Sequence, residues 1–138
     1  MAEGRRIKYD DEDKEIYDFL LSKYPFNKIG ITELFAIALV FGMKYAPGKL
    51  GKTAVGRVRR STLDSTNVLS LMMAVAVEKT GSMDVLADDN EYFTIAEEYA
   101  KTGIQLLDDA FSENKNILDD MEKELLEFYN EHIGDKSV

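Results

Sequence analysis

The chain has no cysteine and only one histidine, His132, among its 138 residues. Without cysteine there is no disulfide framework, no zinc–thiolate site and no thiol nucleophile. A di-iron bundle needs Glu-x-x-His on its helices, but residue 129 is Tyr and there is no second histidine. His132 is interpreted as favouring the C-terminal end of its helix. The composition argues against most enzyme chemistries, and we expect a non-enzymatic protein with no cofactor and no metal.

Long apolar runs are also missing. The longest, Leu34 to Met43, is about half of a membrane span and predicts a buried helix. This helix is the core of the protein or half of a dimer interface, so the sequence leaves a homo-oligomer open. No apolar stretch follows Arg5 and Arg6, which predicts that there is no signal peptide. The absence of cysteine fits a reducing compartment, and we expect a cytoplasmic protein that does not bind membranes.

Acidic residues are plentiful but absent from one window. The net charge is −9, yet residues 34–63 contain no Asp or Glu. The same window carries a charge of +6, so the rest of the chain sums to −15. Its bases are Lys44, Lys49, Lys52, Arg57, Arg59 and Arg60. This segregation predicts a surface that meets an anionic partner, because electrostatic steering depends on the local field as well as on net charge.

Periodicity and capping residues predict an all-α, single-domain bundle of about five helices over residues 1–138. Residues 1–9 lack a pattern and are expected to be frayed. The apolar second helix, capped by Thr32, is expected at the centre of the bundle. The five helices are expected from Asp10–Asp13 to Tyr24, from Thr32 to Lys44 or Tyr45, from residues 64–66 to Gly81, from Asn90 to Phe111, and from residues 114–116 to Gly134. Ser82 to Leu86 predicts a short helical turn, and Gly103 is expected to allow close packing against another backbone.

Residues 46–61 contain three glycines and little helical periodicity, and they predict a loop with an extended piece near Val55 to Val58. The stretch Gly48 to Thr53 includes the Gly-Lys-Thr of a phosphate-binding loop. The full pattern needs a glycine at position 46, which is Ala, and a preceding strand, so we do not expect a nucleotide site. An isolated phosphate on the loop amides and lysines is a weaker alternative.

The six bases predict a nucleic-acid contact, in which they follow a phosphate backbone and Tyr45 beside them stacks on a base. The alternative is that the basic loop docks on the chain's own acidic helices or on a partner subunit, since residues 64–138 sum to −13. The acidic bulk would then meet a basic partner protein or mimic DNA. Arginines that point inward to acids favour the alternative, whereas arginines free on one face favour nucleic acid.

A further group of acids lies between residues 84 and 98. No glycine occurs among them, so the calcium-loop pattern is absent, and we interpret them as helix caps and a solvated helix face. They are Asp84, Asp88, Asp89, Glu91, Glu97 and Glu98.

The third and fourth predicted helices carry a resemblance to a known family. The stretches Thr-Gly-x-x-Asp-Val-Leu, at residues 80–86, and Ala-Glu-Glu-Tyr-Ala, at residues 96–100, resemble small accessory proteins of bacterial DNA phosphorothioation (dnd) modification and restriction systems. The apolar stretch at residues 35–42 followed by a basic loop is also similar, so the resemblance covers about residues 30–112. It implies a cytoplasmic helper in a DNA-modifying defence assembly, and it transfers no functional residues.

Overall fold

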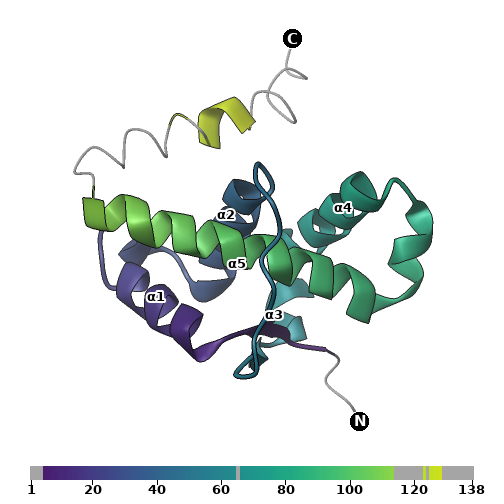
Figure 1. Cartoon of the computed structure of the whole chain (residues 1–138), viewed down its shortest axis with the longest axis horizontal. Helices are drawn as coiled ribbons and strands as arrows, with labels where there is room; N and C mark the ends of the chain where they lie inside the picture. Colours follow the sequence, from purple (N-terminus) through teal and green to yellow (C-terminus); the bar gives the residue numbers. More distant parts are fainter. Residues whose placement is uncertain (1–4, 65, 114–122, 124, 129–138) are drawn as a thin grey trace. The chain divides into compact units, whose positions relative to one another are not determined.

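The computed structural model describes residues 5–64, 66–113, 123 and 125–128. The chain divides into two compact units, Met1–Asp108 and Asp109–Val138 (Figure 1). The described residues of the second unit are all helical. Most of the predicted fifth helix lies outside the described residues, and the prediction of one domain over the whole chain stays a prediction. The fold described below is that of the first unit, which is mainly α-helical as predicted.

The first helix, α1, spans Asp11–Leu21. Three acids occupy its first turn, where negative charge is favoured by the partial positive charge of a helix N-terminus. Its buried residues are Asp13, Tyr17 and Leu20, which share one helical face. The chain then turns through a 3-10 helix, η1, at Phe26–Lys28. This confirms the predicted first helix, which ends ahead of Pro25.

The apolar helix α2 spans Ile31–Gly42 and is buried on most of its sides, as predicted for a central helix. The predicted cap at Thr32 is wrong by two residues, because the N-cap is Gly30. The backbone amide of Gly30 donates to the carboxylate of Glu33 at 3.1 Å. A free amide at the start of the helix is thus hydrogen-bonded without the hydroxyl of a Ser or Thr cap. Thr32 instead faces the core and is 2% exposed.

A small antiparallel sheet pairs the strands β1, Ile7–Tyr9, and β2, Val55–Val58. The extended piece at residues 55–58 was predicted, but the pairing strand was not. Residues 1–9 were expected to be frayed, whereas Ile7 and Tyr9 are buried at 0% and 7% exposure. Three residues are too few to show alternation in a sequence, so only the tertiary partner reveals β1.

The chain after β2 is more helical than predicted. A short helix, α3, spans Arg60–Asp64, where the sequence predicted the end of a loop. The next helix, α4, spans Val68–Thr80 and ends at Gly81, whose φ of 72° is the left-handed conformation that favours glycine. A 3-10 helix, η2, at Met83–Ala87 confirms the predicted turn, and the hydroxyl of Ser82 caps it.

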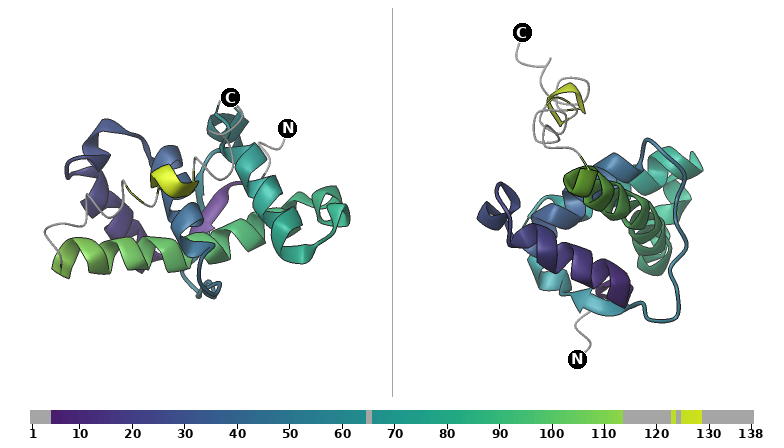
Figure 2. Two further views of the ribbon diagram at one scale, coloured as in Figure 1. Left: turned by 90° about the horizontal axis from the view of Figure 1, so that it is seen from above. Right: turned by 60° about the vertical axis from the view of Figure 1, so that its left-hand side comes forward.

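The longest helix, α5, spans Asp89–Glu113 and runs beside the other helices of the first unit (Figure 2). It crosses α2 with the two backbones in contact. A Cβ added to Gly103 would lie 1.6 Å from the carbonyl oxygen of Ala38, and one added to Gly42 would lie 1.7 Å from the carbonyl oxygen of Tyr99. The close packing predicted for Gly103 is therefore confirmed. Within the described part of the chain, no helix is both long and apolar enough to cross a membrane.

Candidate functional site: the basic loop and its acidic anchors

Arg57 points back into the fold. It lies on β2, and its Nε donates to the carbonyl of Tyr9 at 2.7 Å. Its Nη2 lies 2.7 Å from Oδ1 of Asp11 and 3.3 Å from the carbonyl oxygen of Thr53. The guanidinium is also 5.2 Å from the centroid of the Tyr9 ring. Only 14% of the Arg57 side chain is exposed, so most of its donors face the protein rather than an external phosphate.

Arg60 is tied to the first turn of α5. Its Nη1 donates to Oδ2 of Asp89 at 2.7 Å, and its guanidinium lies 5.7 Å from the centroid of the Phe93 ring. Burial alone would lower the pKa of Arg60, but its hydrogen bond to Asp89 and the nearby Tyr92 raise it above its usual value. Arg60 therefore links α3 to α5.

The other four bases of the window are exposed. Lys44 and Arg59 each interact with another group of the chain. Lys49 and Lys52 have no hydrogen bond or ion pair with the residues that the structure describes. Tyr45, beside them in sequence, is 55% exposed. The structure thus separates the six predicted residues into two inward-facing arginines, Arg57 and Arg60, and four exposed bases.

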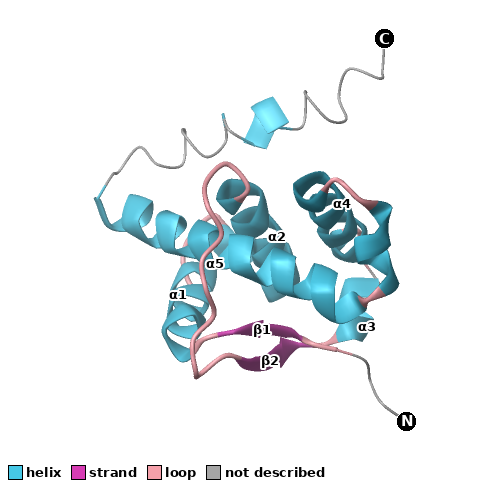
Figure 3. Cartoon of the chain, turned by 45° about the vertical axis from the view of Figure 1, so that its right-hand side comes forward, coloured by secondary structure: helices cyan, strands magenta, loops and turns pink. Residues whose placement is uncertain are grey.

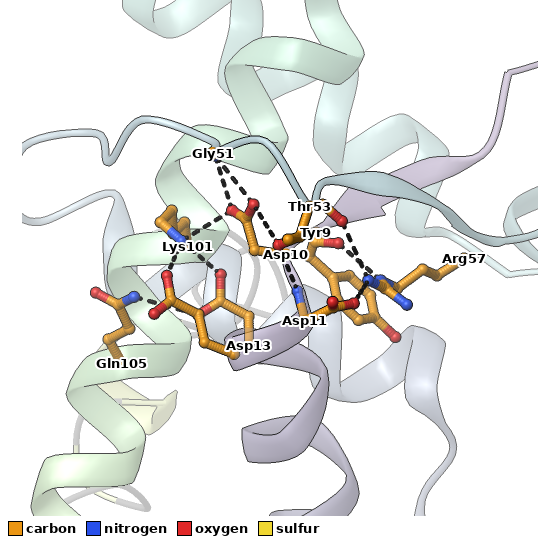
Figure 4. A network of polar contacts seen from close by, with 10 residues as sticks. Tyr9, Asp10, Asp11, Asp13, Gly51, Thr53, Arg57, Lys101 and Gln105 are labelled. Atoms are coloured by element: carbon orange, nitrogen blue, oxygen red, sulfur yellow. Dashed lines mark hydrogen bonds and ion pairs between the residues drawn. The ribbon is translucent and has the colours of Figure 1, made fainter.

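The Gly51-Lys52-Thr53 turn binds an anion that belongs to its own chain. The amide of Gly51 lies 3.0 Å from each carboxylate oxygen of Asp10, and the hydroxyl of Thr53 donates to Asp10 at 3.1 Å (Figure 4). A Cβ on Gly51 would lie 3.0 Å from Oδ1 of Asp10, so glycine permits this approach. The turn that looked like a phosphate-binding loop therefore holds a carboxylate in the position of the anion.

Lys101, on α5, lies among three carboxylates at the start of α1. Its Nζ is 2.8 Å from Asp13, 3.0 Å from Asp10 and 3.2 Å from Glu12. Burial would lower the pKa of Lys101, but its hydrogen bonds to Asp13 and Asp10 raise it above its usual value. Burial would raise the pKa of Asp10, but hydrogen bonds from Gly51 and Lys101 hold it below its usual value. The ammonium of Lys101 and the carboxylate of Asp10 thus favour each other's charged form.

The same three carboxylates are close enough to hold a metal ion, with oxygens within 4.8 Å of one another. The ammonium of Lys101 lies within 3.2 Å of all three, where it supplies the positive charge that a metal would bring. Gln105 also donates to Oδ1 of Asp13 at 3.2 Å. The arrangement is that of an internal ion-pair network.

The chain that leads into this turn is fixed to α5. The amide of Gly48 donates to the carbonyl of Glu98 at 2.8 Å, and the hydroxyl of Thr102 donates to the carbonyl of Ala46 at 2.7 Å. We call residues 46–53 the strap, because the chain here runs from the end of α2, across α5, towards the sheet (Figure 3). The strap passes directly over Lys101, whose side chain would lie 3.3 Å from a Cβ on Gly48.

A second buried acid, Glu97, anchors β1 to α5. Its carboxylate accepts hydrogen bonds from Nη1 and Nη2 of Arg5, each at 2.8 Å, and from the amide of Lys8 at 2.6 Å. Burial raises the pKa of Glu97 above its usual value, although the bonds from Arg5 and Lys8 oppose this. The interpretation of Glu97 as part of a solvated helix face is wrong, because β1 covers it.

The other polar candidates include a helix cap and exposed acids. Oδ1 of Asp88 accepts from the amide of Asn90 at 3.0 Å, so an acid of the group at residues 84–98 caps α5. The predicted start at Asn90 is wrong, because α5 begins at Asp89 and Asn90 lies inside it. Asp84 and Glu91 are exposed. His132 lies outside the described residues.

The sequence did not reveal the buried polar anchors, which are Asp10, Asp13 and Lys101 beneath the strap and Glu97 at β1. In the sequence, Asp10 and Asp13 marked only the start of the first helix. One signal was available, because Asp13 shares a helical face with Tyr17 and Leu20, and an acid on an apolar face implies a buried partner. No comparable signal marked Lys101, which is far from its partners in sequence.

Fold and site together define a class: a mainly helical protein whose basic strap is fastened to buried acids of its own chain. Residues 6–137 match the family of DNA sulphur modification system-associated protein 4, and the chain belongs to this family. The match confirms the resemblance to accessory proteins of dnd systems and extends it to both ends of the chain. Neither a curated protein nor a solved structure matched the chain.

Proposed function

We propose that this protein is a non-catalytic interaction component of a DNA sulphur modification system, and that its acidic surface meets a basic surface of a partner protein. The observation that carries the proposal is the direction of the arginines. Arg57 and Arg60 form ion pairs at 2.7 Å with Asp11 and Asp89 of their own chain. A phosphate backbone would have to compete with these pairs.

Magnitudes also favour a protein partner over nucleic acid. Each phosphate neutralised on duplex DNA contributes about −0.9 to the slope of log affinity against log salt. Lys49 and Lys52 would therefore give a slope of about −2, and all four exposed bases of the window about −4, which is below the slope of about −5 to −9 for a protein that makes six to ten phosphate contacts. The net charge of −9 repels DNA at longer range.

Several acids at the surface are not engaged in ion pairs within the described part of the chain. Glu15, Glu78, Asp84 and Glu91 are exposed and form no ion pair with any residue in the described part of the chain. Exposed charges of one sign steer a partner of the opposite sign and raise its association rate. By contrast, Asp10 and Asp13 are engaged by Lys101, so their carboxylates support the fold rather than proton transfer.

The second candidate is a nucleic-acid contact through the strap and the bases that flank it, with Lys44, Lys49, Lys52 and Arg59 as its residues. It is favoured by the exposure of Lys49 and Lys52 and by the exposed ring of Tyr45 beside them. Aromatic rings next to lysines suit the stacking of single-stranded bases.

The test measures two kinds of binding with one purified protein. Size-exclusion chromatography with light scattering would follow its assembly with each purified protein of the modification system, at low and high salt. Fluorescence anisotropy would follow labelled duplex and single-stranded DNA. We expect a salt-sensitive protein complex and no DNA binding at micromolar concentration. Tight DNA binding that is lost in Lys49→Glu with Lys52→Glu, without any protein complex, would favour the second candidate.

A further inference from the structure

The outer side of α1 carries four acids and an aromatic ring. We call Asp11, Glu12, Glu15, Asp18 and Phe19 the acidic face of α1, and all five are exposed. Phe19 is 46% exposed, so an apolar ring lies at the surface beside these acids. Lys14 is the only base among the exposed residues of α1.

Helical geometry places these side chains on one side of the helix. Asp11, Glu15 and Asp18 follow one another at spacings of four and three residues, and Phe19 lies four residues after Glu15. From Asp11 to Phe19 the face extends about 12 Å along the helix axis. The buried side of the same helix carries Tyr17 and Leu20.

The ion pairs of this face leave its acids accessible. Asp11, Glu12 and Asp18 keep 73%, 70% and 62% of their side chains exposed. Each uses one carboxylate oxygen in its pair, and a carboxylate has about four acceptor positions. Glu15 has no partner among the described residues. The face therefore has spare acceptors for cations from outside.

Phe19 requires that a partner bound to this face offers an apolar group as well as positive charge. Nζ of Lys23 lies 5.4 Å from the centroid of the Phe19 ring, so the ring already interacts with an ammonium. Nearby, Tyr24 is 64% exposed. An occupant that matches this face offers both cations and apolar groups.

We infer that the acidic face of α1 is the docking site for a basic amphipathic helix of a partner protein. The inference rests on the proposed function and names the surface that carries it. Lysines or arginines four residues apart on the partner would match Asp11 and Glu15, and an apolar side chain would cover Phe19. Charge complementarity identifies the occupant, since the four acids repel nucleic acid and a second copy of this acidic chain.

The test uses two charge variants of equal size. Glu15→Lys with Asp18→Lys reverses the acidic face of α1, and Glu78→Lys with Asp84→Lys makes the same change in net charge on α4 and η2. The probe is a synthetic amphipathic peptide with lysines and leucines at helical spacing, and a scrambled peptide of the same composition is its control. Circular dichroism would establish that each variant is folded.

We expect the wild-type protein to bind the amphipathic peptide more tightly than the scrambled one. The α1 variant should lose roughly tenfold in affinity and the α4–η2 variant less than about twofold. Phe19→Ala should weaken binding of the amphipathic peptide while leaving binding of the scrambled peptide unchanged. Equal losses in the two charge variants, or equal binding of the two peptides, would overturn the inference.

Assembly with the purified proteins of the modification system separates this inference from the proposed function. If the wild type and the α1 variant assemble equally well, the protein is an interaction component but the docking site lies elsewhere. If the wild type assembles with none of them, the proposed function fails whatever the peptides show.

Discussion

A single methyl group at Gly103 is expected to force α2 and α5 apart. In Gly103→Ala the new Cβ would lie 1.6 Å from the carbonyl oxygen of Ala38 and 2.9 Å from the amide nitrogen of Gly42, whereas ordinary contacts begin at 3.4 Å. Both obstacles are backbone atoms within a helix. They cannot rotate aside as the end of a flexible side chain can, so the helices themselves have to move.

Two effects of opposite sign determine the size of the change. Replacing glycine by alanine inside a helix gains about 1 kcal/mol of helix propensity. Overpacking a core costs about 1–3 kcal/mol, and a gap of about 1 Å forfeits up to roughly half of the dispersion energy of each contact that it opens. Relief of the overlap requires a shift of roughly 2 Å, which would open contacts along the whole crossing. We therefore expect the free energy of unfolding to fall by about 2–4 kcal/mol.

Urea denaturation followed by far-UV circular dichroism measures this change. Gly81→Ala is the matched control, because nothing lies within 4 Å of its added Cβ and the cost comes only from its φ of 72°. That control should lose about 1 kcal/mol. Gly42→Ala tests the same crossing from α2, and the double variant with Gly103→Ala should cost less than the sum of the two changes.

The reasoning has a clear point of failure. If Gly103→Ala is as stable as the wild type, or is more stable because alanine favours the helix, then the backbones of α2 and α5 are not in contact and the close crossing described here is wrong. A loss no larger than that of Gly81→Ala would lead to the same conclusion.

Three further changes test the buried polar groups. Lys101→Met should lower the free energy of unfolding by about 3–5 kcal/mol at neutral pH, because Asp10 and Asp13 would be left buried without their counter-charge. Thr32→Val should leave it unchanged or raise it by up to about 1 kcal/mol, because the buried hydroxyl of Thr32 has no hydrogen-bond partner among the described residues. Burial raises the pKa of Tyr9 from 10.0 to about 12, so the folded state holds this proton longer than the unfolded state. The stability that Tyr9 contributes through this difference in pKa is fully present below pH 10 and is lost as the pH rises to about 12. Measuring the free energy of unfolding at a series of alkaline pH values would test this.

Each of these changes has its own control. Lys49→Met removes an exposed lysine without a described partner and should leave stability unchanged, and an equal loss in both lysine variants would contradict the network. Thr32→Ser keeps the hydroxyl and removes a methyl group, so it should be less stable than Thr32→Val. Tyr9→Phe should reduce the alkaline loss, and an unchanged profile would show that Tyr9 does not cause it.

The sequence by itself determined the elements whose signals are local. The apolar helix α2 could be predicted because its residues are apolar on every side, which only a central position in the bundle satisfies. Gly81 marked the end of α4, since its position after the last periodic residue favours a left-handed cap. Residues 55–58 were expected to be extended, and they form β2. Each of these signals depends on neighbours within a few positions of the chain.

Only the tertiary structure decided where the charges go. Lys101 is 91 residues from Asp10 and 88 from Asp13 in sequence, and Arg57 is 46 residues from Asp11. Unless it lies on an apolar helical face as Asp13 does, a charged residue carries no local mark that tells whether it will face water or a distant opposite charge, because either outcome satisfies it. The acid-free window was visible in the sequence, but the fold turned Arg57 and Arg60 inward and left Lys49 and Lys52 outside.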